Sequence, residues 1–404
     1  MTEPYRMTDV RGRTHQVNAE LRARGAAVPV VLPGEIDGFV ITQHEPLREF
    51  LTDPDVRKAP EHFGAMRRGE IPAGWPLLGF ATVPGMTTAD GADLRRLRGL
   101  VAQEFTPRRV ESLRPRVAEL TEKLLDDLGE AAANNDGVAD LRRHFALPLP
   151  LRVITELFGV DERYRQRLHE VSNVVVSPLA TPDEAIAASL ELRAVLAEVT
   201  AERRAHPGND LTSALIAVRE ENGDRFSEPE LIGIMQILII AGHETTFNLI
   251  TNAVRALCAH RDQLALVLRG EASWAQVVEE ALRFDGPLNY FPFRYPARDL
   301  DVDGVTIPAG TPVLAGYASA GRDQRVYGDS ADRFDITRDS ARHLSFGHGP
   351  HFCLGAPLAR LEATVALERL FTRFPQLDLA VPDAELPRDV SFLGNTATAL
   401  PVRI

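Results

Sequence analysis

A continuous helical pattern from Pro229 to His260 constrains the fold of this chain more than any other feature of the sequence. Ser227 is followed three residues later by Glu230, a capping box that predicts where the helix begins. A helix of roughly thirty residues extends about 45 Å. Its centre, Leu238 to Gly242, is apolar on nearly every side. The pattern therefore predicts a long helix whose middle is buried in a large core.

Polar residues follow directly on this apolar centre. Gly242 costs a helix about 1 kcal/mol relative to alanine, which indicates close approach of something flat or a local widening of the helix. Glu244, Thr245 and Thr246 lie in the same buried stretch. Because a buried carboxylate is costly unless it is paired or used, the sequence marks Glu244 and its neighbours as a candidate functional site.

The rest of the chain is predicted to be mostly helical with a small β-sheet region. Strand-like segments are short and clustered. No linker, repeat or long run of like charge marks a boundary, so we expect residues 1–404 to form a single domain. The further helices are predicted at Asp93 to Glu104, Arg109 to Ala133, Leu149 to Phe158, Ile186 to Ala205, Trp274 to Phe284 and Pro357 to Phe374, and the strands at Gly38 to Gln43, Leu300 to Ile307, Thr311 to Tyr317 and near the C-terminus.

Charge and cysteine content exclude several classes of protein. A net charge of −12 argues against nucleic acid as a general partner, because phosphate binding needs a basic face. The two cysteines, Cys258 and Cys353, lie far apart, which argues against a disulfide scaffold and favours a reducing cytoplasm. The N-terminus lacks a secretory signal, and the longest apolar stretch, Leu231 to Gly242, is too short to span a bilayer. We expect a soluble cytoplasmic monomer that binds neither nucleic acid nor membrane.

A local basic patch is compatible with this acidic balance. Its candidate members could equally lie on ordinary solvated helix faces, so both interpretations stay open. The candidates are Arg95, Arg96, Arg108, Arg109 and Arg360.

Cys353 lies in a loop rich in glycine and aromatic residues, Phe346 to Gly355, directly before a predicted helix. A thiolate at a helix N-terminus is stabilised by the positive end of the helix dipole and by backbone N–H groups. Gly349 and Gly355 allow the backbone to pass close to a flat macrocycle, and Phe346 can cover its proximal face. From these residues alone, Cys353 is either a thiolate ligand for haem iron or an inert buried cysteine.

The loop pattern Phe-x-x-Gly-x-x-x-Cys-x-Gly resembles the haem-binding signature of the cytochrome P-450 family. Three further segments match the family in order along the chain. Ala241 to Thr246 resembles its oxygen-activating helix motif, Glu280 to Arg283 its Glu-x-x-Arg helix, and Ala331 to Phe334 the segment whose arginine joins that pair. The resemblance implies the cytochrome P-450 fold, with haem b between the long central helix and the cysteine loop and its helix.

The resemblance also implies roles for individual residues. Cys353 would ligate the haem iron, and Glu244 with Thr245 would deliver protons during oxygen activation. Alternatively, Thr245 only bonds to a helix carbonyl and Glu244 pairs with an arginine. The residues implied to contact the haem are Arg98, Arg294, His351, Phe346, Gly349, Ala241 and Gly355, of which the first three would bind its propionates. A buried ionic cluster with a structural role would consist of Glu280, Arg283 and Arg333.

One position departs from the family pattern. Where relatives carry a histidine four residues before the conserved arginine, this chain has Leu94 ahead of Arg98. Leucine cannot hydrogen-bond a propionate, so the sequence predicts either weaker anchoring of haem on this side or a different placement of the propionate. On this basis Leu94→His is expected to hold haem more tightly.

The activity implied by the resemblance is that of a haem-thiolate monooxygenase, an oxidoreductase that inserts one oxygen atom from O₂ into a bulky hydrophobic substrate such as a polyketide, terpenoid or steroid. Electrons would come from NAD(P)H through a ferredoxin reductase and a ferredoxin, because the chain has no flavin or iron–sulfur motif. Two alternatives stay open: oxidative cyclisation or coupling without net oxygen insertion, and a non-catalytic haem-thiolate binding or sensing protein. The apolar pocket is expected to draw on Trp75, Leu77, Phe80, Asn173 to Leu179, the helix near Ala241, Leu288 to Phe291, and Phe392 with Leu393.

Overall fold

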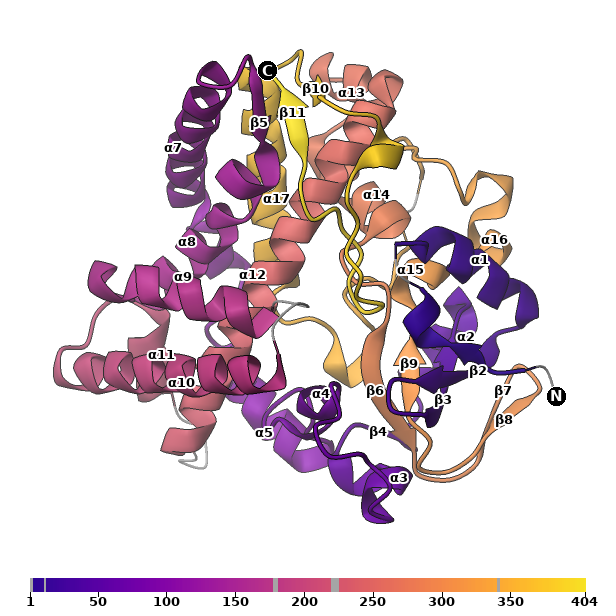
Figure 1. The fold of residues 1–404 in the computed structure, drawn as a ribbon. Coiled ribbons are helices and arrows are strands. Elements are labelled where there is room, and N and C mark those ends of the chain that lie inside the picture. Colours follow the sequence, from indigo (N-terminus) through magenta and orange to yellow (C-terminus); the bar gives the residue numbers. More distant parts are fainter. Residues whose placement is uncertain (1–2, 11, 177–180, 219–224, 340–341) are drawn as a thin grey trace.

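Figure 1 shows a predominantly helical molecule with a small sheet region, which confirms the predicted fold class. The structure is a computed structural model and describes residues 3–10, 12–176, 181–218, 225–339 and 342–404. Most helices gather on one side of the molecule, and the main sheet lies on the other with α1 and α2 beside it. No helix within these ranges is both long enough and apolar enough to cross a membrane.

The long helix predicted at the centre is α12, Glu228–Ala259, with 32 residues. It runs through the helical side of the molecule (Figure 1) and packs against α8, α14 and α17. The Glu230 carboxylate accepts hydrogen bonds from the backbone N–H and the hydroxyl of Ser227, at 2.7 and 2.8 Å. The predicted capping box is therefore confirmed.

The apolar centre of α12 is less buried than predicted. Ile239 is buried, but Leu238 and Gly242 are half-buried and Ala241 is exposed, because this part of the helix lines an internal cavity. The helix continues through Gly242, where a Cβ atom would make an ordinary contact with Ile154 Cδ1 at 3.6 Å. The alternative of a local widening is thus wrong, and Gly242 faces the cavity instead.

The other predicted helices are present, with small shifts at their ends. The exception is the predicted helix from Arg109 to Ala133, which is divided into α6 and α7. Pro115, in the first turn of α7, has no backbone N–H with which to continue the hydrogen bonds of α6. The α-helices are α1 Thr14–Arg24, α2 His44–Phe50, α3 Gly64–Arg67, α4 Leu78–Thr82, α5 Gly91–Ala102, α6 Pro107–Glu111, α7 Arg114–Ala133, α8 Pro148–Leu157, α9 Glu162–Val176, α10 Pro182–Ala205, α11 Leu211–Ala217, α12 Glu228–Ala259, α13 Arg261–Leu268, α14 Trp274–Asp285, α15 Tyr317–Ala320, α16 Gln324–Tyr327 and α17 Ala356–Arg373.

The main sheet has six strands in the order β1-β2-β3-β9-β6-β4. β2 and β3 pair antiparallel, β3 pairs in parallel with β9, and β9 pairs antiparallel with β6. A three-stranded sheet, β10-β11-β5, and a hairpin of β7 and β8 lie outside it. The strands are β1 Tyr5–Arg6, β2 Ala27–Leu32, β3 Ile36–Ile41, β4 Val56–Arg57, β5 Val138–Asp140, β6 Phe291–Pro296, β7 Leu300–Val302, β8 Val305–Ile307, β9 Val313–Ala315, β10 Asp378–Leu379 and β11 Pro401–Arg403.

Three apolar clusters fill the interior. The largest, which we call the helical core, joins α5, α7, α8, α10, α12, α14 and α17. The second lies against the main sheet and contains Phe63, Trp75 and Phe293, whose rings contact one another. The third, which we call the α2 core, contains Leu47 and Phe50 together with residues of β3, β9 and α15. The cavity described next lies between the helical core and the α2 core, since both contribute to its lining.

Candidate active site

The functional residues predicted from distant parts of the sequence meet at one cavity, between α12 and the loop that precedes α17. Cys353 lines this cavity from the loop, and Thr245 lines it from α12. Glu244 and Gly349 are not among the described residues that line it. The predicted site residues brought together there are Arg98, Ala241, Thr245, Arg294, Phe346, His351, Cys353 and Gly355.

Cys353 is held at the cavity by a loop that ends where α17 begins at Ala356. Its backbone N–H donates to the Phe346 carbonyl oxygen at 2.8 Å. Burial raises the pKa of the Cys353 thiol, whereas hydrogen bonds from the backbone N–H groups of Gly355 and Ala356 and the charge of Arg98 lower it. The sulfur has stabilising donors on the α17 side and is exposed to the cavity, so it can bind a metal ion as a thiolate.

The glycines of this loop serve different purposes. Gly349 has φ of 72°, and a Cβ atom there would lie 2.7 Å from the carbonyl oxygen of Leu51. Close approach of another backbone therefore explains Gly349 without any macrocycle. At Gly355 a Cβ atom would lie 4.0 Å from Cys353 Sγ, beside the sulfur at the cavity surface.

Glu244 and Thr245 are neighbours on α12 in different surroundings. The Thr245 hydroxyl donates to the Ala241 carbonyl oxygen at 2.7 Å, which is the helix bond left open as an alternative. Burial raises the pKa of Glu244 to about 7, and the charge of Asp389 acts in the same direction while that of Arg142 opposes it. Near neutral pH the Glu244 carboxyl is therefore present in both protonation states, as a group that relays protons should be.

Basic side chains gather at one end of the cavity. Lys58 and Arg294 are 4% and 3% exposed, and His351 is half-buried. The acidic group beside them is Asp90, whose carboxylate accepts from the backbone N–H groups of Lys58 and Ala59, each at 2.8 Å. Asp90 Oδ1 also lies 4.0 Å from His351 Nε2. Nη1 of Arg294 is buried and has no hydrogen-bond partner in the structure.

These basic groups disfavour one another's charged forms. Burial lowers the pKa of His351 to about 4, and the charges of Arg294 and Lys58 act in the same direction, although the nearby Asp90 carboxylate opposes them. Arg98, on α5, also lines the cavity and donates to the Phe352 carbonyl oxygen at 2.8 Å. Surplus buried cations with an unused N–H donor fit an anionic ligand. The residues present thus fit a haem: the basic side chains would hold its two carboxylates, and the Cys353 thiolate would hold its iron.

Leu94 does not lie at this cationic end. It is 4% exposed, packs in the helical core, and is not among the described residues that line the cavity. The basic residue that the sequence analysis missed is Lys58. One signal pointed to it, since Lys58 and Lys123 are the only lysines among the 45 basic residues of the chain.

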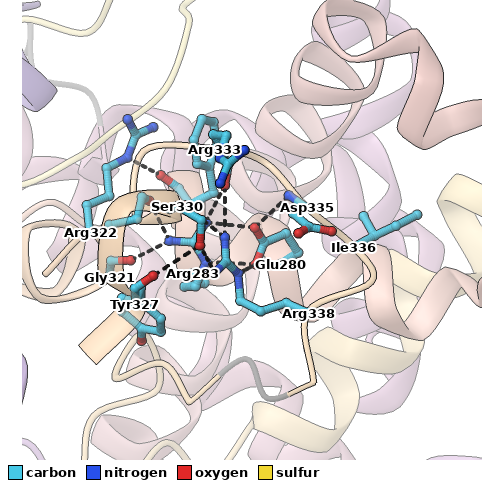
Figure 2. A network of polar contacts seen from close by, with 12 residues as sticks. Glu280, Arg283, Gly321, Arg322, Tyr327, Ser330, Arg333, Asp335, Ile336 and Arg338 are labelled. Atoms are coloured by element: carbon cyan, nitrogen blue, oxygen red, sulfur yellow. Dashed lines mark hydrogen bonds and ion pairs between the residues drawn. The ribbon is translucent and has the colours of Figure 1, made fainter. Parts of the chain in front are cut away.

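The predicted ionic cluster is present in a modified form (Figure 2). Arg283 donates through Nε and Nη2 to the two carboxylate oxygens of Glu280, each at 2.7 Å. Arg333 takes part through its carbonyl oxygen, which accepts from Arg283 Nη2 at 2.7 Å, and not through its guanidinium group as predicted. The second guanidinium group near Glu280 belongs to Arg338, with Nε 3.5 Å from Glu280 Oε2. A carbonyl contact of this kind is available to any residue type, so the arginine motif could not reveal it.

The apolar lining was predicted in part. Leu288, Phe291 and the α12 segment near Ala241 line the cavity as expected, but Trp75 and Leu77 pack in the cluster against the main sheet. Of the predicted segment 173–179, residues 177–179 lie outside the described residues. Further elements contribute lining residues that the prediction did not include, among them Met86, Thr87, Phe105, Ile154, Leu249, Leu282, Tyr317 and Leu358.

A buried acid on α17 was also missed. Glu362 lines the cavity, is 2% exposed, and its Oε2 atom has no hydrogen-bond partner in the structure. Burial raises the pKa of Glu362 well above the usual range. Glu362 interrupts an apolar stripe of Leu358, Leu361 and Val365 at helical spacing, and this interruption is a signal that the sequence does contain.

Comparison with known proteins places the chain among bacterial haem enzymes. The family model described as Cytochrome P450 matches residues 274–390. The chain is 40% identical over 391 residues to the vitamin D(3) 25-hydroxylase of Pseudonocardia autotrophica, covering 96% of this chain and 93% of that protein. It is 39% identical over 397 residues to the 6-deoxyerythronolide B hydroxylase of Saccharopolyspora erythraea, covering 96% of each.

A solved structure has nearly the same fold over the whole chain. It is that of testosterone-bound CYP154C4 from Streptomyces sp. ATCC 11861, with a TM-score of 0.94 and 42% identity, and the match covers 100% of this chain and 98% of that one.

Proposed function

The chain belongs to the cytochrome P450 family, whose members bind haem b through a cysteine thiolate, and we propose that it hydroxylates a rigid, largely apolar substrate of the steroid or polyketide class. The chain is a monooxygenase and hence an oxidoreductase. One observation carries our assignment of the site. Cys353, in the loop before α17, and Thr245, on α12, line the same apolar cavity. The overall reaction consumes the substrate, O₂, two electrons and two protons, and yields the hydroxylated product and water.

When bound, the haem supplies the iron that binds and activates O₂. In our proposal the Cys353 thiolate holds this iron, and the basic side chains of Arg98, Arg294 and His351 bind the haem carboxylates. Support comes from the N–H donors at Cys353 and from the buried Nη1 atom of Arg294 that lacks a partner. Phe346, Gly355 and Ala241 line the same cavity and would contact the macrocycle.

Proton delivery is assigned to Thr245 and Glu244. The Thr245 hydroxyl faces the cavity but donates to the Ala241 carbonyl, so it must rotate away from that carbonyl before it can donate into the cavity. Glu244 has a pKa near 7 and can take up a proton and release it again at neutral pH. The carboxyl therefore replenishes the proton that the hydroxyl passes on.

The substrate class is proposed from the lining and from the relatives. Met86, Phe105, Ile154, Leu238 and Leu288 give the cavity an apolar surface that suits a hydrophobic substrate. One relative is a vitamin D(3) hydroxylase, another acts on 6-deoxyerythronolide B, and one structural neighbour holds testosterone. All three ligands are bulky and lipophilic, which supports the same class here.

The electron donor is proposed to be a ferredoxin, reduced by NAD(P)H through a ferredoxin reductase in the cytoplasm. Next to Cys353, Phe352 is 42% exposed, and the exposed Arg95 and Arg108 lie on nearby helices α5 and α6. Three of the five predicted basic-patch residues pair with glutamates instead: Arg96 with Glu230, Arg109 with Glu104, and Arg360 with Glu279. Any docking surface for an acidic ferredoxin on this face is therefore small.

The test is substrate binding followed by turnover. A panel of steroids and macrolactones is titrated into the ferric holoprotein while the Soret band is followed for a shift from low to high spin. Compounds that shift the band are incubated with NADPH, a surrogate ferredoxin and its reductase. The molecular masses of the products are then measured by mass spectrometry. We expect a product heavier by one oxygen atom that carries label from ¹⁸O₂. A product that has lost two hydrogens and gained no label would instead identify an oxidative coupling enzyme.

A further inference from the structure

Lys58 lies across from Arg294 at the cationic end of the cavity. β4 and β6 pair antiparallel, with Val56 opposite Pro296 and Arg57 opposite Tyr295. The next position in this register places Lys58 opposite Arg294. Both side chains are buried and both line the cavity. Like charges that face each other across two strands destabilise a sheet. An anion bound between Lys58 and Arg294 would remove this repulsion.

The Lys58 ammonium group is positioned by β6 but keeps free donors. Its Nζ atom donates to the Pro292 carbonyl oxygen at 3.3 Å and lies 4.8 Å from the centre of the Phe291 ring. An ammonium group has three N–H donors, and this carbonyl accepts from one of them. The Pro292 carbonyl and the Phe291 ring belong to β6, the strand that also carries Arg294. They therefore hold the Lys58 amine close to the point where Arg294 enters the cavity.

Asp90 does not neutralise this pair. Its carboxylate accepts from the backbone N–H groups of Lys58 and Ala59, and it lies 4.0 Å from His351 Nε2. Burial lowers the pKa of the Lys58 amine well below its usual range, the charge of Arg294 lowers it further, and Asp90 opposes this only in part. A second anion is needed to keep both cations charged.

We propose that Lys58 and Arg294 together bind one carboxylate of the haem. The inference rests on the proposed function, because it requires the haem. Arg294 offers a planar set of N–H donors, whereas Lys58 offers a compact charge from the opposite strand. A carboxylate between them receives hydrogen bonds from both sides.

Haem loss from the holoprotein tests this directly. The rate of haem transfer to excess apo-myoglobin is compared for the parent, Lys58→Met, Lys58→Arg and Lys123→Met. Lys123 is the matched control, because it is the other lysine and its exposed side chain pairs with Glu119 on α7. We expect Lys58→Met to lose haem about tenfold faster or more, and Lys58→Arg and Lys123→Met to stay close to the parent. Resonance Raman spectra should show shifted propionate-bending bands in Lys58→Met alone.

Each contrary result is informative. Unchanged haem transfer and unchanged propionate bands in Lys58→Met would overturn the proposal. Equally fast loss from Lys58→Met and Lys58→Arg would also overturn it, because packing and not charge would then matter. Unchanged haem loss in Lys58→Met together with loss of the spin shift for carboxylate-bearing compounds would assign Lys58 to the substrate. Failure of the proposed function is distinguishable, since the parent would then lack the red-shifted Soret band of a carbon monoxide thiolate complex.

Discussion

Arg283 and Glu280 form a two-pronged ion pair on α14, with both N–O distances at 2.7 Å and both side chains almost fully buried. Arg283 also donates to the carbonyl oxygens of Gly321, Ala331 and Arg333, so a single guanidinium group joins α14 to the segment after α15. Removing one partner of a buried pair leaves the other charge uncompensated.

Arg283→Met should therefore lower the free energy of unfolding by about 3–5 kcal/mol, because Glu280 loses its two-pronged partner and three carbonyl groups lose a donor. Urea denaturation followed by circular dichroism measures this loss. Arg333→Ala is the control, because Arg333 contributes only its main-chain carbonyl oxygen to Arg283. If Arg333→Ala destabilised the protein as much as Arg283→Met, the structural assignment of this cluster would be wrong.

Cys353→Ala should abolish the strongly red-shifted Soret band of the reduced carbon monoxide complex, because no other described cysteine lines the cavity and a thioether such as that of Met86 cannot form a thiolate. Cys258→Ala is the matched control: Cys258 is buried in the helical core, and burial raises the pKa of its thiol to about 12. The band should survive in Cys258→Ala. Its survival in Cys353→Ala would show that another residue holds the iron.

Thr245→Ala should leave haem binding intact and divert reducing equivalents to hydrogen peroxide, because the hydroxyl that faces the cavity is lost. Thr245→Ser keeps the hydroxyl and serves as the control. Glu244→Gln should slow turnover with less peroxide, since it withholds the proton that the hydroxyl passes on. NADPH consumption, product and peroxide are measured together, and parental coupling in both Thr245→Ala and Glu244→Gln would rule out the assigned roles.

The pH dependence of turnover should report on Glu244. As a proton donor it is active in the protonated form, so coupled turnover is expected to fall as pH rises through about 7. Asp389 raises the pKa of Glu244 and Arg142 lowers it. Asp389→Asn should therefore move the inflection to lower pH, and Arg142→Gln should move it to higher pH. If Asp389→Asn and Arg142→Gln shifted the inflection in the same direction, or if the inflection persisted in Glu244→Gln, the pH dependence of turnover would belong to another group.

Strong local patterns made much of this fold predictable. The capping box and the apolar period of α12 are encoded within one continuous segment, and so is the Cys353 loop before α17. β2 and β6 escaped prediction because Pro29, Pro292 and Pro296 count against strands. Here the neighbouring strands and the irregular register between Phe291 and Arg294 accommodate them.

The site was harder to predict where it depends on pairing between distant segments. Lys58 follows β4, a strand of two residues whose position is fixed only by its pairing with β6. No local pattern announces such a strand. Arg333 illustrates a second limit. It contacts Arg283 through its main-chain carbonyl oxygen, and any residue type could make this contact, so the sequence does not indicate it. Asp389 and Arg142, which tune Glu244, are likewise far from it in sequence.

The cavity lies between the helical core, which contributes Leu249, Leu282 and Leu358, and the α2 core, which contributes Tyr317. A haem bound there would contact both cores, and its binding would stabilise the folded state by an amount that grows with the logarithm of the ratio of haem concentration to its dissociation constant. The helical core and the α2 core should then unfold in one thermal transition, and its midpoint should rise with the haem content of the sample. A variant such as Lys58→Met would melt at a lower temperature even though the side chain contributes little to either core. The melting temperature of this protein would thus depend in part on how much haem is available to bind.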